Sequence, residues 1–125
     1  MATISDVEQI VSGLAGVTVG QRYSNRTWFI NGHGFVWERP LSGADLKRLG
    51  DEPAPEGPIV AVRVADLDEK DALLHTGLPG VFTISHFDGY PSVLIQLKKV
   101  HKRTLRQLIE DAWSVCSEAK PKKRR

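Results

Sequence analysis

The segment HFDGYP, which begins at His86, holds the side chains best suited to acid–base chemistry. His86 and Asp88 lie two positions apart, and the hydroxyl of Tyr90 follows two positions later. An imidazole beside a carboxylate can move a proton, and the three groups together can cradle a ligand. A nucleophile is lacking, because Ser85 and Ser92 have no G-x-S-x-G context. The alternative is a structural turn, favoured by the glycine and proline of the segment, in which Asp88 bonds loop amides.

A second candidate site is cationic and lies between the last expected strand and the last expected helix. This basic turn consists of Lys98, Lys99, His101, Lys102, Arg103 and Arg106. Cations at a helix N-terminus interact unfavourably with the helix dipole, so they do not stabilise the fold at this position. Free N–H groups, the dipole and flanking cations together favour a phosphate group. The sequence therefore predicts phosphate contacts at this turn, and the alternative is a basic turn that is merely solvated.

The last six residues, KPKKRR, are five cations and a proline. Such a segment cannot bury apolar area, so we expect residues 119–125 to form a disordered basic tail after a single domain at residues 1–118. The cations of the tail are Lys120, Lys122, Lys123, Arg124 and Arg125. They are suited to neutralising nucleic-acid phosphates without selecting a base sequence. The alternative is a solubilising end that has no partner.

Charge is distributed unevenly along the 125 residues, whose net charge is +2. Residues 1–97 contain 7 basic and 12 acidic side chains, whereas residues 98–125 contain 10 basic and 3 acidic ones. A positive end on an acidic body attracts polyanions to that end of the molecule. The charge pattern thus predicts nucleic acid as the partner and indicates no residue that would select a base.

Metal and cofactor chemistry have no support in the sequence. The four histidines, at positions 33, 75, 86 and 101, are dispersed without ligand spacing, and Cys116 stands alone on an apolar helical stripe. Glycine-rich phosphate loops are absent from the sequence. One cysteine allows no intrachain disulfide, and neither a signal peptide nor an apolar run of membrane-spanning length is evident. We therefore expect a cytoplasmic, non-enzymatic protein without metal, cofactor or membrane contact.

The dipeptide NG at positions 31 and 32 marks a tight hairpin between two aromatic-rich strands. The pairs expected from a two-residue loop are Ile30 with His33, Trp28 with Phe35, and Arg26 with Trp37. One face of the hairpin then carries Trp28, Ile30, Phe35 and Trp37. We expect this face to belong to the hydrophobic core, and the alternative is a surface on which nucleic-acid bases stack.

The remaining elements follow from caps and periodicity. A first helix is expected after the cap Ser5, with Glu8 completing a capping box, and Ser42 and Asp66 cap two later helices. Strands are expected at residues 20–23, 27–30, 33–38, 59–64, 81–84 and 92–98, and the last helix at residues 102–117. This order predicts an α+β fold with two layers, α-β(3)-α-β-α-β(2)-α, in which helices cover an antiparallel sheet.

The segments HFDGYPSVLIQL and LIEDAW, together with the early helix and the Trp-rich hairpin, resemble the MmcQ/YjbR-like family of small bacterial proteins, in particular its actinobacterial branch. The resemblance covers nearly the whole chain, including RPLSGADLKRLG. It implies a two-layer α/β domain, roughly α-β(3)-α-β(2)-α, similar to secretion chaperones. Members are usually labelled DNA-binding because the fold resembles a double-wing DNA-binding domain, and this favours DNA over RNA as the partner. The order of elements expected here agrees with that fold apart from an extra strand or helix at residues 59–75. The resemblance implies no catalytic residue. This sequence departs from the family pattern at the cap of the last helix, where His101 replaces the usual acidic residue.

The features above lead to three functional hypotheses. The first is a monomeric bacterial DNA-binding protein whose basic turn and tail contact phosphates without sequence selectivity. The second is a protein- or peptide-binding adaptor or chaperone-like module, by analogy of fold. The third is a small-molecule pocket or enzyme around His86, Asp88 and Tyr90.

Overall fold

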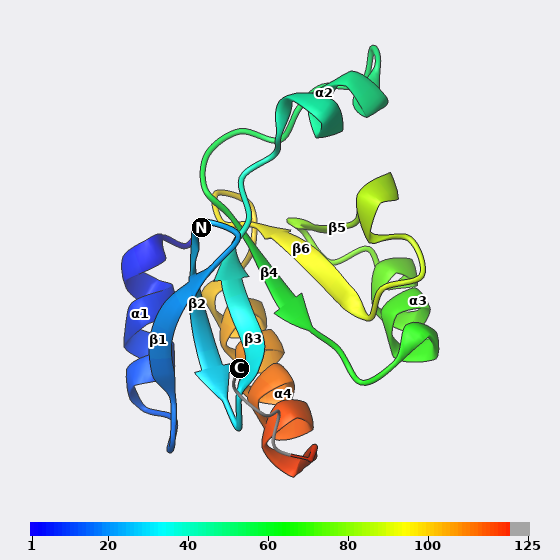
Figure 1. Cartoon of the computed structure of the whole chain (residues 1–125). Coiled ribbons are helices and arrows are strands. Elements are labelled where there is room, and N and C mark those ends of the chain that lie inside the picture. Colours follow the sequence, from blue (N-terminus) through cyan, green and yellow to red (C-terminus); the bar gives the residue numbers. More distant parts are fainter. Residues whose placement is uncertain (121–125) are drawn as a thin grey trace.

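Six antiparallel strands form one sheet. From one edge of the sheet to the other, the strand order is β1-β2-β3-β4-β6-β5 (Figure 1). This computed structural model describes residues 1–120. The strands are β1 (Thr18–Arg22), β2 (Asn25–Ile30), β3 (His33–Glu38), β4 (Ile59–Arg63), β5 (Val81–Phe82) and β6 (Ser92–Gln96). The helices are α1 (Ile4–Ser12), α2 (Gly43–Leu49), α3 (Leu67–His75) and α4 (Lys102–Glu118), with a 3-10 turn η1 at Ser85–Phe87. The predicted α+β class and the predicted order of elements are confirmed, and the strand after α3 is shorter than expected.

Helices α1 and α4 form the second layer, and they pack on one face of the sheet and on each other (Figure 1). The buried stripe of α4 consists of Leu105, Leu108, Ile109, Ala112 and Cys116. It meets buried strand residues such as Phe35, Val60 and Ile95. Burial raises the pKa of the Cys116 thiol. Cys116 is therefore a core residue, as its position on the apolar stripe predicted.

The cap of α1 differs from the prediction. The cap is Thr3, whose side-chain oxygen accepts a hydrogen bond from the Asp6 amide at 3.2 Å. The Asp6 carboxylate in turn accepts one from the Thr3 amide at 2.8 Å. The predicted cap at Ser5 is wrong because this reciprocal capping box starts the helix two residues earlier, so that Ser5 already lies in its first turn.

A β-bulge in β3 changes the register that the hairpin was expected to have. The observed pairs are Ile30 with His33, Phe29 with Gly34, Trp28 with Val36, and Thr27 with Trp37. The first pair confirms the two-residue loop, whereas the predicted partners of Trp28 and Arg26 are wrong. Phe35 is an extra residue in β3, and both Phe35 and Val36 are buried beneath the helices. One added residue reverses the side on which the following residue lies, so Trp37 faces away from the helices.

A smaller apolar cluster lies on the sheet face that α1 and α4 leave uncovered. Its buried residues are Ile59, Ala61, Ile84, Phe87 and Leu94, with Trp37, Leu41 and Phe82 packed against them. The turn η1 therefore covers the middle of this face, and Phe87 is its buried contact residue. Helix α2 lies beyond the end of the sheet at which β3 stops and β4 begins (Figure 1).

Candidate functional site

Helix α3 fixes the HFDGYP loop (residues 86–91) through one lysine. The ammonium nitrogen of Lys70 donates hydrogen bonds to the carbonyl oxygen of Phe87 at 2.6 Å and to that of Tyr90 at 2.9 Å. Lys70 is only 5% exposed. Burial lowers the pKa of Lys70, while the negative charges of Asp88 and Asp71 act in the opposite direction. Two carbonyl oxygens of the loop are thus satisfied by a cation from another element, and this contact sets the conformation of the loop.

The aromatic side chains of the loop gather around Phe87. Its ring centre lies 6.4 Å from that of Trp37, 6.0 Å from that of His86 and 5.8 Å from that of Tyr90, the last in an edge-to-face arrangement. The guanidinium carbon of Arg39 lies 5.5 Å from the centre of the Phe87 ring. Edge-to-face pairs and cation–π contacts favour this arrangement beyond simple burial. The bulge in β3 is what brings Trp37 to this cluster.

A cleft of about 870 Å³ opens beside the loop. Its walls come from three segments, which are the β1–β2 hairpin (Arg22, Tyr23, Asn25), the end of β3 with the approach to α2 (Trp37, Arg39, Ser42), and the HFDGYP loop. The three side chains predicted from the sequence, His86, Asp88 and Tyr90, all line it. Among residues 1–120, however, no hydrogen bond joins His86 to Asp88. The cleft has the size of a small-molecule site, and His86 and Asp88 line it without being hydrogen-bonded to each other.

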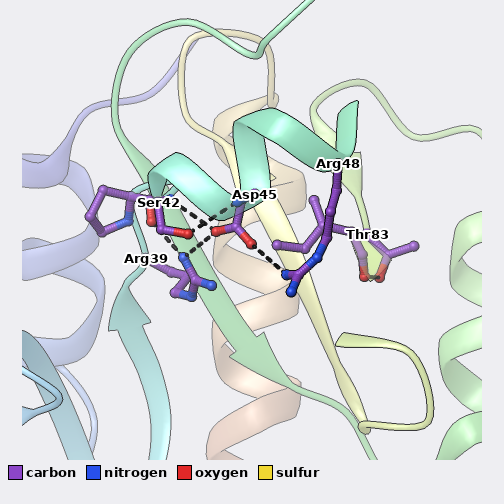
Figure 2. Close-up of polar contacts among 7 residues, drawn as sticks. Arg39, Ser42, Asp45, Arg48 and Thr83 are labelled. Atoms are coloured by element: carbon purple, nitrogen blue, oxygen red, sulfur yellow. Dashed lines mark hydrogen bonds and ion pairs between the residues drawn. The ribbon is translucent and has the colours of Figure 1, made fainter. Parts of the chain in front are cut away.

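One wall of the cleft is fixed by a buried ion pair, shown in Figure 2. A guanidinium nitrogen of Arg39 lies 3.0 Å from the carboxylate of Asp45, whose side chain is 2% exposed. Burial raises the pKa of Asp45, but hydrogen bonds from Ser42 and the charge of Arg39 outweigh it and leave that pKa below its usual value. Arg48 adds a weaker contact at 3.7 Å. The same carboxylate completes the capping box of α2, so it joins the helix to the end of β3.

The basic turn lies on the other side of the molecule, at the N-terminus of α4. All six of its side chains are exposed. His101 is the cap residue and provides no side-chain hydrogen bond, and the first turn of the helix contains no acidic residue. Lys102 lies 3.7 Å from the carboxylate of Asp6 in α1. The stem of Lys98 passes over Gly57, where an added Cβ would lie 3.0 Å from it.

Of the tail, the structure describes Ala119 and Lys120. Lys120 is exposed, and its carbonyl oxygen lies 2.7 Å from Nε2 of His33. The predicted contacts of Lys122, Lys123, Arg124 and Arg125 lie outside the described residues. Within residues 1–120, no three histidine, cysteine or carboxylate side chains come together in a way that could hold a metal ion. Over the same range, no helix combines the length and the apolar character needed to cross a membrane.

Two mycobacterial proteins align with nearly the whole chain. Over 117 residues the chain is 46% identical to uncharacterized protein Rv2570 of Mycobacterium tuberculosis, covering 90% of this chain and 87% of that relative. Uncharacterized protein Mb2600 of Mycobacterium bovis matches with the same identity and coverage. The chain belongs to the family of these mycobacterial proteins. No family model matches the chain, and no solved structure matches it.

In this chain, the residues singled out from the sequence occupy two separate places. The loop residues line the cleft on the face opposite α4, and the basic turn stands at the start of α4. Sequence patterns did not identify four residues that line the cleft or hold its loop, namely Arg22, Trp37, Arg39 and Lys70. A buried lysine looks like a surface residue in its helical sequence, and only the fold brings it to the loop. A β-bulge likewise leaves no recognisable signal in the sequence of a short strand of alternating apolar and polar residues.

Proposed function

We propose that the protein is a monomeric, non-enzymatic nucleic-acid-binding protein of the cytoplasm, and that its basic turn contacts the phosphate backbone, most readily that of DNA. The observation that carries this proposal is the exposure of six basic side chains around a helix start without a side-chain cap. The first-turn N–H groups and the helix dipole then act on an anion together with these cations. Arg103 and Arg106, one turn apart on the exposed side of α4, extend the positive surface along the helix.

Two further points support a polyanion as the partner. Acidic compensation at the turn is limited, because Asp6 is the one carboxylate within 4.0 Å of these cations among residues 1–120. The sequence also resembles MmcQ/YjbR-like proteins, which are usually labelled DNA-binding. We propose that the chain is a member of that group as well. Contacts to phosphates alone would give binding without selection of a base sequence.

The test compares the full chain with two double variants on duplex DNA, single-stranded DNA and RNA at low salt. Lys102→Gln with Arg103→Gln removes two charges from the basic turn. Lys47→Gln with Arg48→Gln removes two exposed charges from α2 and serves as the matched control. We expect the first pair to weaken binding to duplex DNA about tenfold or more and the control to leave it unchanged, as loss of phosphate contacts requires. Equal affinities of the two double variants would contradict the proposal.

A further inference from the structure

The cleft beside the HFDGYP loop has aromatic walls that remain partly exposed. Tyr23 is 89% exposed and Tyr90 is 41% exposed, while Trp37 is half-buried at the cleft wall. Tyrosine and tryptophan are enriched at interfaces, because they combine a large apolar ring with a polar group that can face water. Flat, apolar walls of this kind on opposite sides of a cleft accommodate a planar ring.

Arg22 supplies a cation to the same cleft and is held in a defined position. Its guanidinium lies over Gly34, where an added Cβ would be 3.0 Å from one guanidinium nitrogen and 3.0 Å from the methyl group of Thr27. Arg22 thus reaches from β1 across β2 to β3, a path that the missing side chain of Gly34 leaves open. The Tyr23 ring supports the guanidinium at 5.7 Å.

The charge of Arg22 is not neutralised by the protein. Among residues 1–120, no carboxylate lies within 4.0 Å of it. Arg39, the other arginine of the cleft, is already paired with Asp45. A half-buried guanidinium without a carboxylate partner favours an anion from solution, and its fork geometry matches a carboxylate or a phosphate.

Asp88 is the acidic side chain of the cleft, and it opposes an incoming anion. Its negative charge also acts on the ammonium group of Lys70, which bonds the main chain of the same loop, and raises the pKa of that lysine against the effect of burial. Among residues 1–120, the cleft therefore combines one arginine and one aspartate without ion-pair partners and several aromatic rings. This combination differs from the basic turn, where cations are exposed and aromatic side chains do not contribute.

We propose that this cleft binds a small molecule in which a planar aromatic ring carries a carboxylate or phosphate group, with Arg22 pairing with the anion and Trp37 and Tyr90 contacting the ring. This site is independent of the nucleic-acid contacts proposed for α4. It uses the sheet face opposite that helix, and it gives the exposed tyrosines and Arg22 a common ligand.

The test uses four probes in ligand-observed NMR and calorimetry with the full chain. Adenosine monophosphate and indole-3-acetate are the anionic probes, and adenosine and indole-3-acetamide are their uncharged counterparts. We expect at least one anionic probe to bind and its uncharged counterpart to bind about tenfold more weakly, as loss of an arginine–anion pair predicts. The anion that binds distinguishes a phosphate from a carboxylate ligand. The proposal would be overturned if neither anionic probe binds, or if the uncharged counterparts bind with the same affinity as the anionic probes.

Three variants assign the binding to the cleft. Arg22→Met keeps the length of the side chain and should weaken the anionic probe about tenfold, whereas Asp88→Asn should strengthen it by removing a repelling charge. Arg103→Met, in the basic turn, should leave the probe affinity unchanged, and Arg22→Met should leave DNA binding unchanged. Circular dichroism verifies that each variant is folded. Unchanged probe affinity in both folded cleft variants, or weakening by Arg103→Met, would show that the cleft is not the site.

Discussion

The ammonium nitrogen of Lys70 lies 2.6 Å from the carbonyl oxygen of Phe87, and this contact joins helix α3 to the loop that lines the cleft. The same nitrogen bonds the carbonyl oxygen of Tyr90. Lys70 does not line the cleft itself, so helix α3 acts on the cleft by holding the loop that does. The conformation of the loop depends on a buried cation, whose burial is compensated by hydrogen bonds to the main chain.

Replacement of Lys70 by Met should lower the free energy of unfolding by about 1–3 kcal/mol, because one buried and one partly buried carbonyl oxygen lose their donor. It should also increase amide hydrogen exchange in residues 85–92. Urea denaturation and exchange measured by mass spectrometry check the two effects. Lys47→Met, at an exposed position of α2, is the matched control and should change neither quantity. A Lys70→Met protein with unchanged stability and unchanged exchange in the loop would rule out this role.

Replacement of Asp45 by Asn should destabilise the protein in a pH-dependent manner. The folded-state pKa of Asp45 is lowered, so its charge stabilises the fold above the ordinary carboxyl pKa of about 3.9 and loses that effect as the pH falls through the folded value. We expect a deficit of about 1–3 kcal/mol at pH 7 that shrinks as the pH falls below about 4. This deficit is measured by urea unfolding of the unaltered protein and of Asp45→Asn, from pH 7 down to the lowest pH at which both are folded. A deficit that stays constant throughout would argue against the ion pair with Arg39.

Replacement of Gly34 by Ala should destabilise the fold by about 1–3 kcal/mol, since the new methyl group meets Arg22 and Thr27 at 3.0 Å. Gly43→Ala is a matched control, because nothing lies within 4 Å of the position where its Cβ would be built. At this helical site the control should be neutral or stabilise by about 0.4–1 kcal/mol. Thermal and urea unfolding compare the two proteins. Equal effects of the two substitutions would mean that Arg22 does not lie over Gly34.

Much of the fold could be predicted from the sequence because its signals are local. The caps Ser42 and Asp66, the hairpin at Asn31, and the apolar stripe of α4 each act within a few residues. The pairing of the hairpin strands and the hydrophobic periodicity then predict the order of helices and strands along the chain. The cap of α1 was missed because Thr3 with Asp6 and Ser5 with Glu8 both fit a capping box in the sequence. In the fold Glu8 instead pairs with Arg26 of β2, and the first of the two boxes caps the helix.

The candidate site could be predicted only in part. His86, Asp88 and Tyr90 could be singled out from the sequence because their side chains are suited to acid–base chemistry and lie two positions apart. In the structure all three line the cleft. Trp37 was expected in the main core and instead lines the cleft, because the bulge at Phe35 reverses its side. Arg22 and Lys70 act over long sequence separations, and no spacing rule connects them to residues 86–90.

The central claim, phosphate contacts by the basic turn, is tested most directly by the salt dependence of duplex DNA binding. The logarithm of affinity should fall linearly with the logarithm of salt concentration, with a slope of roughly −0.9 for each phosphate contacted. We predict that Lys102→Gln with Arg103→Gln makes this slope shallower by roughly 1.8, as loss of two contacts requires. Absence of binding at the lowest salt, or an unchanged slope in the double variant, would contradict the account.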